Sequence, residues 1–235
     1  MPKGHRVRFA WLHIKDDILA QISECKYRPG DRISTVTQLA EKHGVSTTTV
    51  RQALDELSTE GVLEVRQGRG TIVAPPKREY DPTKGFEEQV HRLGGAPRTH
   101  IYQTQWSTQQ TGGARLLKLR KGERHWEVTR LHYIDEEPIM IDVAWFPRTV
   151  AERFMGDSRL LMTLFSSLPK HLGYQQWHVS VTSVRVTTER AFSDVLGIPR
   201  KTPFFHIDRL ITVKNKLLFS SALVLRSDKF QLTFP

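Results

Sequence analysis

Two short helices followed by a β-hairpin, predicted over residues 39–73, constrain the fold more than any other feature of this 235-residue sequence. Leu39 and Ala40 give the first helix its apolar positions, and Gly44 suits the left-handed conformation that closes a helix. Ser46 then stands where an N-cap residue belongs. The second helix carries one apolar stripe at helical spacing, formed by Val50, Ala53, Leu54 and Leu57. The pattern predicts a helix-turn-helix whose second helix packs by one face and exposes the other.

A glycine-containing hairpin follows the second helix. Residues 62–66 and 71–74 are rich in β-formers and flank the turn 67–70, whose two glycines permit a tight reversal. Arg66 and Arg69 bring positive charge to its tip. The order of helix, turn, helix and basic hairpin predicts a winged helix-turn-helix, which is a DNA-binding module. The alternative is a plain helical hairpin followed by a β-hairpin, with solvated threonines.

The exposed face of the second predicted helix carries the side chains expected to meet DNA. In helix-turn-helix proteins the N-terminal residues of this helix contact base edges in the major groove. Arg51 can pair with guanine or phosphate, and Gln52 can pair with adenine. The predicted DNA contacts are Thr35, Thr37, Ser46, Thr47, Thr48, Thr49, Arg51, Gln52, Gln67, Gly68 and Arg69.

With these elements in place, residues 11–74 resemble the N-terminal module of the GntR family of bacterial transcription regulators. The resemblance rests on a first helix over 11–25, the Pro-Gly turn 28–33, and the motifs 49–54 and 67–71. It implies a DNA-binding regulator. A homodimer is expected, because one recognition helix reads only a half-site and a palindromic operator mirrors the symmetry of the protein.

Two positions depart from the family pattern. The family usually has Glu-Arg where this chain has Val36-Thr37, and it usually has Arg directly after Gly-Val-Ser, where this chain has Thr47. Both missing arginines commonly contact DNA in the family. The departures therefore put the operator sequence or the affinity in question, while the buried positions that set the fold are intact.

Composition fits a protein with a polyanionic partner, since the formal net charge is +10. Residues 1–78 hold 13 Lys+Arg and 9 Asp+Glu, so the basic excess is not concentrated in the DNA-reading module. No run approaches the roughly 20 apolar residues of a membrane span, and no signal-peptide pattern appears. The single cysteine, Cys25, cannot form an internal disulfide. We expect a cytoplasmic protein without membrane contact, and the histidines show no metal-binding spacing.

A proline-rich stretch separates the first module, residues 1–74, from the rest. Three prolines in residues 75–82 cannot continue a helix or a central strand, so 75–84 is predicted to be an extended linker. Beyond it, residues 85–235 mix helical and β-rich segments, with hairpins predicted over 125–146 and 204–225. This pattern predicts an α+β domain, an antiparallel sheet with flanking helices.

The second domain resembles the UTRA ligand-sensing domain of the HutC-type branch of the GntR family. The resemblance is carried by the motifs 85–89, 116–123, 130–139, 196–199 and 226–230. It implies a chorismate-lyase-like fold that binds effector and dimerises. It also implies a pocket, lined by the central sheet, for a small and usually anionic metabolite.

The resemblance places the anion anchors on the first hairpin. The family often uses Arg-x-Arg there, and the equivalent here is Arg130-Leu131-His132. Positions 130 and 132 share one face of a strand, and the fork of Arg130 suits a carboxylate or phosphate; the alternative is a solvated strand face. Asp142 is expected across the hairpin, where it either accepts from a ligand hydroxyl or amine or pairs with Arg130.

The remaining candidates are pocket walls. Phe219, Leu223 and Leu225 stand where the family usually has polar ligand contacts, and Trp145 is a further candidate wall, with core packing as the alternative. Apolar walls with few polar anchors favour a carboxylate with a flat or aliphatic body over an amino-sugar phosphate.

These observations together predict a ligand-responsive repressor rather than an enzyme. It would bind a double-stranded DNA operator as a homodimer, respond to a small anionic metabolite, and use no cofactor. One alternative is a DNA-tethered enzyme with chorismate-lyase-like chemistry, which fold analogy alone supports. The other is a regulator that has no ligand response.

Overall fold

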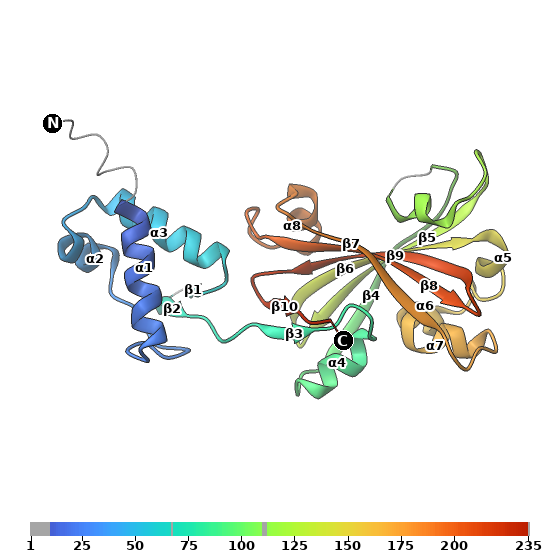
Figure 1. Cartoon of the computed structure of the whole chain (residues 1–235), viewed down its shortest axis with the longest axis horizontal. Coiled ribbons are helices and arrows are strands. Elements are labelled where there is room, and N and C mark those ends of the chain that lie inside the picture. The colour runs from blue at the N-terminus through green and yellow to red at the C-terminus, as the bar shows by residue number, and fades with distance from the viewer. Residues whose placement is uncertain (1–9, 67, 110–111, 235) are drawn as a thin grey trace. The chain divides into compact units, whose positions relative to one another are not determined.

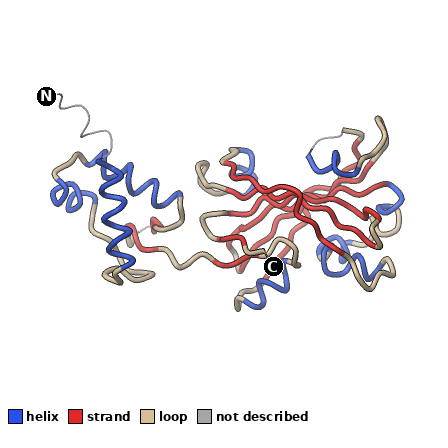
Figure 2. Tube along the Cα trace, viewed as in Figure 1, coloured by secondary structure: helices blue, strands red, loops and turns tan. Residues whose placement is uncertain are grey.

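The computed structural model describes residues 10–66, 68–109 and 112–234 of the chain. The chain forms two compact units. One contains the chain up to Lys77 together with Ser227–Lys229, and the other contains Arg78–Arg226 and the residues from Phe230 onward. Helices dominate the first unit and strands dominate the second (Figure 2).

The N-terminal unit is a winged helix-turn-helix, as predicted. Its described elements are α1 (Ala10–Ser23), α2 (Val36–His43), α3 (Thr47–Thr59), β1 (Leu63–Arg66) and β2 (Gly70–Val73). The two strands pair antiparallel, with Leu63 opposite Val73. The turn between α2 and α3 spans only three residues, so the two helices are held at a defined angle.

Local side chains set both ends of that turn. Thr35 caps α2 by accepting from the Gln38 backbone N–H at 3.3 Å, and the Gln38 side chain accepts from the Thr35 N–H at 2.9 Å. Gly44 ends α2 with φ of 63°, a left-handed conformation that side chains with a Cβ rarely adopt. Ser46 caps α3 by accepting from the Thr49 N–H at 3.2 Å.

The apolar stripe of α3 forms the core of this unit. Val50 and Leu57 are fully buried and pack with Ile14 and Ile18 of α1. The stripe predicted from the sequence is therefore confirmed, and the opposite face of α3 is left to solvent.

A six-stranded antiparallel sheet forms the centre of the second unit (Figure 1). In space the strands run β4-β5-β6-β9-β8-β7. Their bounds are β4 (Pro97–Ser107), β5 (His125–Ile134), β6 (Glu137–Pro147), β7 (His178–Thr187), β8 (Phe204–Val213) and β9 (Lys216–Arg226). Both predicted hairpins are present, as β5–β6 and β8–β9.

Helices cover both faces of the sheet. Within the described residues they are α4 (Phe86–Arg92), η1 (Gly112–Leu117), α5 (Arg148–Ala151), α6 (Ser158–Met162), α7 (Leu164–His171) and α8 (Arg190–Leu196). The face that carries Phe146 and Phe219 packs against α4 to α7, and we call it the α7 face. The other face, which carries Trp145, packs against η1 and α8, and we call it the α8 face. Figure 1 shows α8 on the side of the sheet opposite to α4, α6 and α7.

A short parallel pair of strands lies within the stretch predicted to be a linker. Strand β3 (Arg78–Tyr80) pairs with β10 (Phe230–Leu232), and Tyr80 is buried with its ring edge-on to Phe230. The structure thus differs from an extended linker over 75–84, because only residues 74–77 lack regular structure between β2 and β3. The reason is tertiary: the prolines of this stretch bar a helix, but an aromatic side chain and a parallel partner stabilise a strand that the local sequence does not announce.

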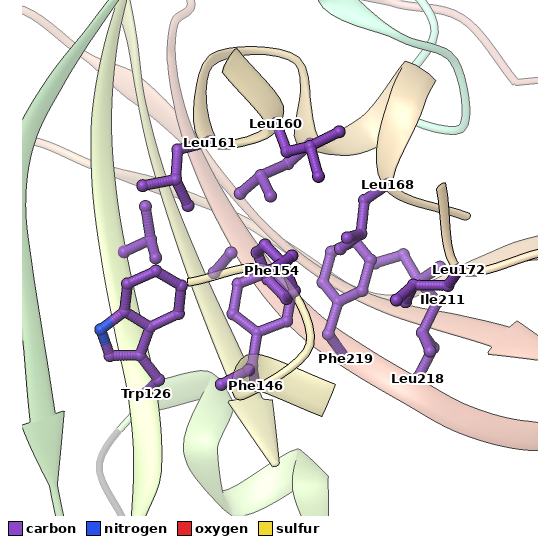
Figure 3. Close-up of a cluster of buried hydrophobic side chains, with 14 of the residues drawn as sticks. Trp126, Phe146, Phe154, Leu160, Leu161, Leu168, Leu172, Ile211, Leu218 and Phe219 are labelled. Carbon is purple, nitrogen blue, oxygen red and sulfur yellow. The ribbon is translucent and has the colours of Figure 1, made fainter. Parts of the chain in front are cut away.

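The largest apolar cluster of the second unit lies between the sheet and α5 to α7 (Figure 3). The Phe146 ring lies at its centre, 4.8 Å from the Phe219 ring and 5.0 Å from the Phe154 ring, centroid to centroid. Trp126 packs beside it at 6.2 Å. This cluster fixes the helices α5 to α7 against one half of the α7 face.

Truncating the central ring should destabilise the second unit strongly. Phe146→Ala removes a fully buried aromatic side chain and leaves a cavity, which typically costs about 3–5 kcal/mol. Chemical denaturation followed by tryptophan fluorescence measures this loss. Val184→Ala, at a position 43% exposed, is the control and should change stability by less than about 0.5 kcal/mol. A loss below about 1 kcal/mol in Phe146→Ala would contradict this packing.

Candidate functional site

The N-terminal part of α3 presents polar side chains to solvent. Thr47, Thr48, Arg51 and Gln52 are all exposed. Thr49 is half-buried, and its hydroxyl lies 2.9 Å from the Ser46 hydroxyl. The structure therefore brings together most of the side chains predicted to meet DNA, at the end of the helix that such proteins insert into the major groove.

The two threonines of α2 differ in what they do. Thr35 is the N-cap of α2, and its hydroxyl is already engaged with Gln38. Thr37 is exposed in the first turn of the same helix. Helix capping thus accounts for Thr35, whereas the exposed side chain of Thr37 is available to contact DNA.

The wing carries charge at its tip. Gly68 and Arg69 are exposed, and Gly68 has φ of 77°. Gln67, also predicted to meet DNA, lies outside the described residues. Sequence reasoning missed Arg32, which forms an antiparallel β-bridge with Ile72 of β2 and whose Nε lies 3.1 Å from the point that a Cβ on Gly70 would occupy. The available signal was a basic residue, Arg32, directly before the apolar Ile33 in the loop that leads into α2.

A second candidate site lies on the α7 face of the sheet, between two apolar clusters. Four polar side chains meet there, from β5, β6 and β8: Arg130, His132, Asp142 and Arg209. Each is at most 3% exposed. Arg130 and Asp142 are direct neighbours across β5 and β6, as predicted.

Arg130 and Asp142 form a buried ion pair through Nη2 and Oδ2. Arg130 Nη1 also donates to the backbone carbonyls of Leu161 and Met162, at 3.3 and 3.2 Å. Its Nε is buried and has no hydrogen-bond partner among the described residues. The guanidinium therefore keeps one buried donor that no group of the described residues uses.

His132 and Asp142 complete this cluster with unused polar atoms of their own. His132 Nδ1 lies 3.0 Å from the Thr99 hydroxyl, while its Nε2 lies 3.7 Å from Asp142 Oδ2, beyond hydrogen-bond reach. In the described part of the chain neither that Nε2 nor Asp142 Oδ1 has a hydrogen-bond partner. Three unpartnered buried atoms in one cluster are unusual, because buried polar groups are nearly always satisfied.

Charge and burial set the protonation of this cluster. Burial lowers the pKa of His132, so the imidazole is neutral at pH 7. Burial by itself raises the pKa of the Asp142 carboxyl, but the charges of Arg130 and Arg209 and the His132 contact together hold that pKa well below its ordinary value. Asp142 is therefore ionised.

Arg209 is a second functional candidate that sequence reasoning missed. Its Nε donates to the Ser221 hydroxyl at 3.0 Å, its Nη1 donates to the Pro82 carbonyl at 3.0 Å, and its Nη2 lies 3.9 Å from Asp142 Oδ1. The signal was present in the strand pattern, because Arg209 occupies the same face as Ile207 and Ile211. A charged residue between two apolar positions on a buried face indicates a specific partner.

A small cavity of about 10 Å³ opens at this cluster, with room for about one water molecule. The segment between β3 and α4, together with α7, covers it, and the sheet forms its floor. Its lining residues are Tyr80, Lys84, Phe86, Glu87, Arg130, His132, Met140, Asp142, Phe165, Arg209 and Leu223. The Phe86 ring lies 4.6 Å from the His132 ring, so an aromatic side chain closes the cavity.

The predicted walls are only partly brought together. Leu223 lines the cavity beside Asp142. Phe219 and Leu225 share its face of β9 but pack into the two flanking apolar clusters. Trp145, predicted as a wall, does not line this cavity: it lies on the α8 face and donates from Nε1 to Glu127 Oε2 at 2.9 Å. The reason is strand alternation, since positions 142 and 145 fall on opposite faces.

A larger open groove, of about 280 Å³, lies nearby, between α4 and the end of β10. Its lining includes Glu79, Asp81, Arg92 and Phe234. We favour the smaller cavity as the ligand site, because the unpartnered buried atoms of Arg130, His132 and Asp142 belong to the cluster that lines it, whereas the groove is an open, mixed-charge surface.

Comparison with known families assigns each unit. The family described as "Bacterial regulatory proteins, gntR family" matches residues 11–73, and the UTRA domain matches residues 92–231. The HTH-type transcriptional repressor NagR of Bacillus subtilis is 27% identical over 94% of this chain and 91% of its own length. The histidine utilization repressor of Pseudomonas aeruginosa is 30% identical over 67% of this chain and 64% of its own length.

Other curated regulators match over 57% to 60% of their own length. The crystal structure of PhnF from Mycobacterium smegmatis superposes with a TM-score of 0.57 at 21% identity, covering 94% of this chain and 98% of that one. At this identity the superposition supports the fold alone. None of the described helices is both long and apolar enough to span a bilayer.

Protonation of His132 should make the second unit weaker in mild acid. Its folded-state pKa lies below the unfolded value of about 6.5, so the unfolded chain takes up a proton first as the pH falls. Stability should therefore decline between pH 7.5 and pH 5.5, by up to about 1.4 kcal/mol per pH unit for one such group. Asp142 does not contribute to the pH dependence of stability in this range, because its carboxyl takes up a proton only below about pH 4.

Thermal unfolding of His132→Gln across this pH range checks the assignment. The variant should lose less stability on acidification than the wild type; part of the slope should remain, because burial also lowers the pKa values of His125 and His206. His178→Gln, at an exposed position, is the control and should keep the full slope. Equal slopes in wild type and His132→Gln would show that His132 is not the titrating group.

Proposed function

Because the chain belongs to the UTRA-containing, HutC-type branch of the GntR family of bacterial transcription regulators, we propose that it is a repressor released from its operator by a small anionic metabolite. Its family and relatives are transcription regulators, so the chain is a regulator and not an enzyme. The chorismate-lyase-like alternative is thereby set aside.

The exposed end of α3 and the wing support the DNA-binding half of this proposal. Arg51 and Gln52 can reach base edges, and the short hydroxyl side chains of Thr47 and Thr48 suit phosphates and thymine methyls. Thr37 and Thr47 add no charge, so fewer phosphates are neutralised than in relatives with arginine at both positions, and binding should depend less steeply on salt. We also propose a homodimer on a palindromic operator, since one α3 helix reads a single half-site.

The buried two-arginine cluster carries the effector half. Arg130 has one buried N–H, on Nε, left unused, and a charged donor of this kind can hydrogen-bond to an anion. Phe86, Phe165 and Leu223 supply apolar walls around it. A small carboxylate with an apolar or aromatic body suits this lining better than a sugar phosphate, whose several hydroxyls would meet few partners. A hydroxyl or amine on the ligand could donate to Asp142.

In the described structure the cavity is too small for such a ligand. Binding therefore requires part of the cover to move, and we propose that the part is the segment between β3 and α4 with the first turn of α4, residues 81–87. This segment follows β3 directly, and β3 follows the chain that joins the two units. A ligand that prefers the moved segment shifts the population between two states, and this is how occupancy can reach the DNA-binding unit.

Arg51→Ala should weaken operator binding by about 1–3 kcal/mol if Arg51 pairs with a base. Fluorescence anisotropy with an operator selected from random DNA measures the change. Arg190→Ala, which removes an exposed guanidinium on α8 of the second unit, is the matched control and should bind as the wild type does. If Arg51 contacts only phosphate, the loss should be uniform over all sequences. Wild-type affinity of Arg51→Ala for every sequence would overturn the placement of α3 in the groove.

A further inference from the structure

We propose that Arg209 is the second anion contact of the effector site and the group that links the occupancy of that site to the segment leading to the DNA-binding unit. This inference rests on the proposed function, because it assumes that the cavity at Arg130 takes an anionic effector. Arg209 would recognise the charge of the ligand, and its hydrogen bond to the Pro82 carbonyl would carry the effect of binding to the covering segment.

The charges of the buried cluster define the ligand. Arg130 and Arg209 contribute two positive charges, Asp142 contributes one negative charge, and His132 is neutral. The cluster therefore holds one positive charge in excess. At the mouth of the cavity Lys84 pairs with Asp81 at 3.2 Å, and Glu87 is half-exposed, where solvent weakens its influence.

An excess charge in a buried site is costly unless it is compensated. One carboxylate would neutralise the excess positive charge of the cluster, whereas a phosphate dianion would leave a net negative charge. The cluster thus selects monoanions, and the selection depends on Arg209, since without it the remaining Arg130–Asp142 pair is already neutral.

The same guanidinium also holds the covering segment in place. Its Nη1 donates to the carbonyl of Pro82, which lies two residues beyond the end of β3. The neighbouring backbone is held by Gln89, whose side chain accepts from the Asp81 N–H at 2.7 Å and donates to the Asp81 carbonyl at 3.0 Å. The hydrogen bond from Arg209 to Pro82 therefore connects the sheet at the floor of the cavity to the segment that covers it.

An incoming carboxylate competes with Pro82 for Arg209. A carboxylate can accept two parallel N–H bonds from one guanidinium and carries a full negative charge, whereas the Pro82 carbonyl is neutral and accepts one such bond. The guanidinium should turn toward the ligand, and the buried Pro82 carbonyl then loses its partner. Because a buried carbonyl without a hydrogen bond is unfavourable, the segment should move until the Pro82 carbonyl accepts from another donor.

The experiment uses the full chain and three probe anions: benzoate, 4-hydroxybenzoate and hexanoate, each compared with its neutral primary amide. Calorimetry gives affinities, and amide hydrogen exchange reports on Asp81, Thr83 and Lys84. At least one carboxylate should bind, and its amide should bind at least tenfold more weakly. The bound carboxylate should speed exchange at these amides at least threefold.

Four variants separate the roles. Arg209→Met should weaken the carboxylate at least tenfold and abolish the exchange response. Arg209→Lys keeps the charge but not the fork, so it should bind more tightly than Arg209→Met and still show no response. Arg130→Met tests the primary anchor. Arg226→Met is the matched control, because Arg226 is a buried arginine that donates to Glu137 and to the Pro138 carbonyl on the α8 face; it should leave the affinity within twofold.

The outcomes are distinct. If no carboxylate binds the wild type, the proposed effector class and this inference fall together. If a carboxylate binds through Arg130 but equally well to both Arg209 variants, the proposed function stands and the role of Arg209 is overturned. If binding needs Arg209 but exchange at 81–84 does not respond, the coupling is overturned. Should Arg209→Met not fold, Arg209→Lys and the wild-type exchange data decide the same questions.

Discussion

The ion pair between Arg130 and Asp142 is the constraint on which the second unit depends. Both side chains come from neighbouring strands of the sheet and are withdrawn from water, where desolvation costs several kcal/mol per ion. An apolar pair of similar volume would often be as stable. The pair therefore makes more sense as part of a binding site. Arg209 strengthens that view, since it adds a second guanidinium that the single carboxylate does not balance.

Most of the fold could be predicted from the sequence, because it rests on local chemistry. Gly44 and Ser46 end one helix and begin the next by their own backbone and side-chain preferences, and Val50 and Leu57 mark the buried face of α3 by spacing alone. The hairpin partners Arg130 and Asp142 were also placed correctly, because a short turn fixes which residues face each other.

What the sequence did not reveal depends on long-range contacts. Arg209 lies far along the chain from Arg130, and only the strand order brings β8 near β6, through β9. The strand β3 exists because β10 pairs with it, which no local pattern announces. Trp145 was predicted as a candidate wall with core packing as the alternative, and the alternation of β6 puts it on the face opposite to Asp142.

The central claim is that an anion at the Arg130–Asp142–Arg209 cluster and DNA at α3 bind with linked free energies. The most direct measurement is the affinity of the best-binding carboxylate for the free protein and for the protein saturated with operator. Linkage requires the carboxylate to bind the DNA complex more weakly, by about fivefold or more, and the operator affinity to fall by the same factor when carboxylate is saturating. Equal carboxylate affinities for the free and DNA-bound protein would contradict the account.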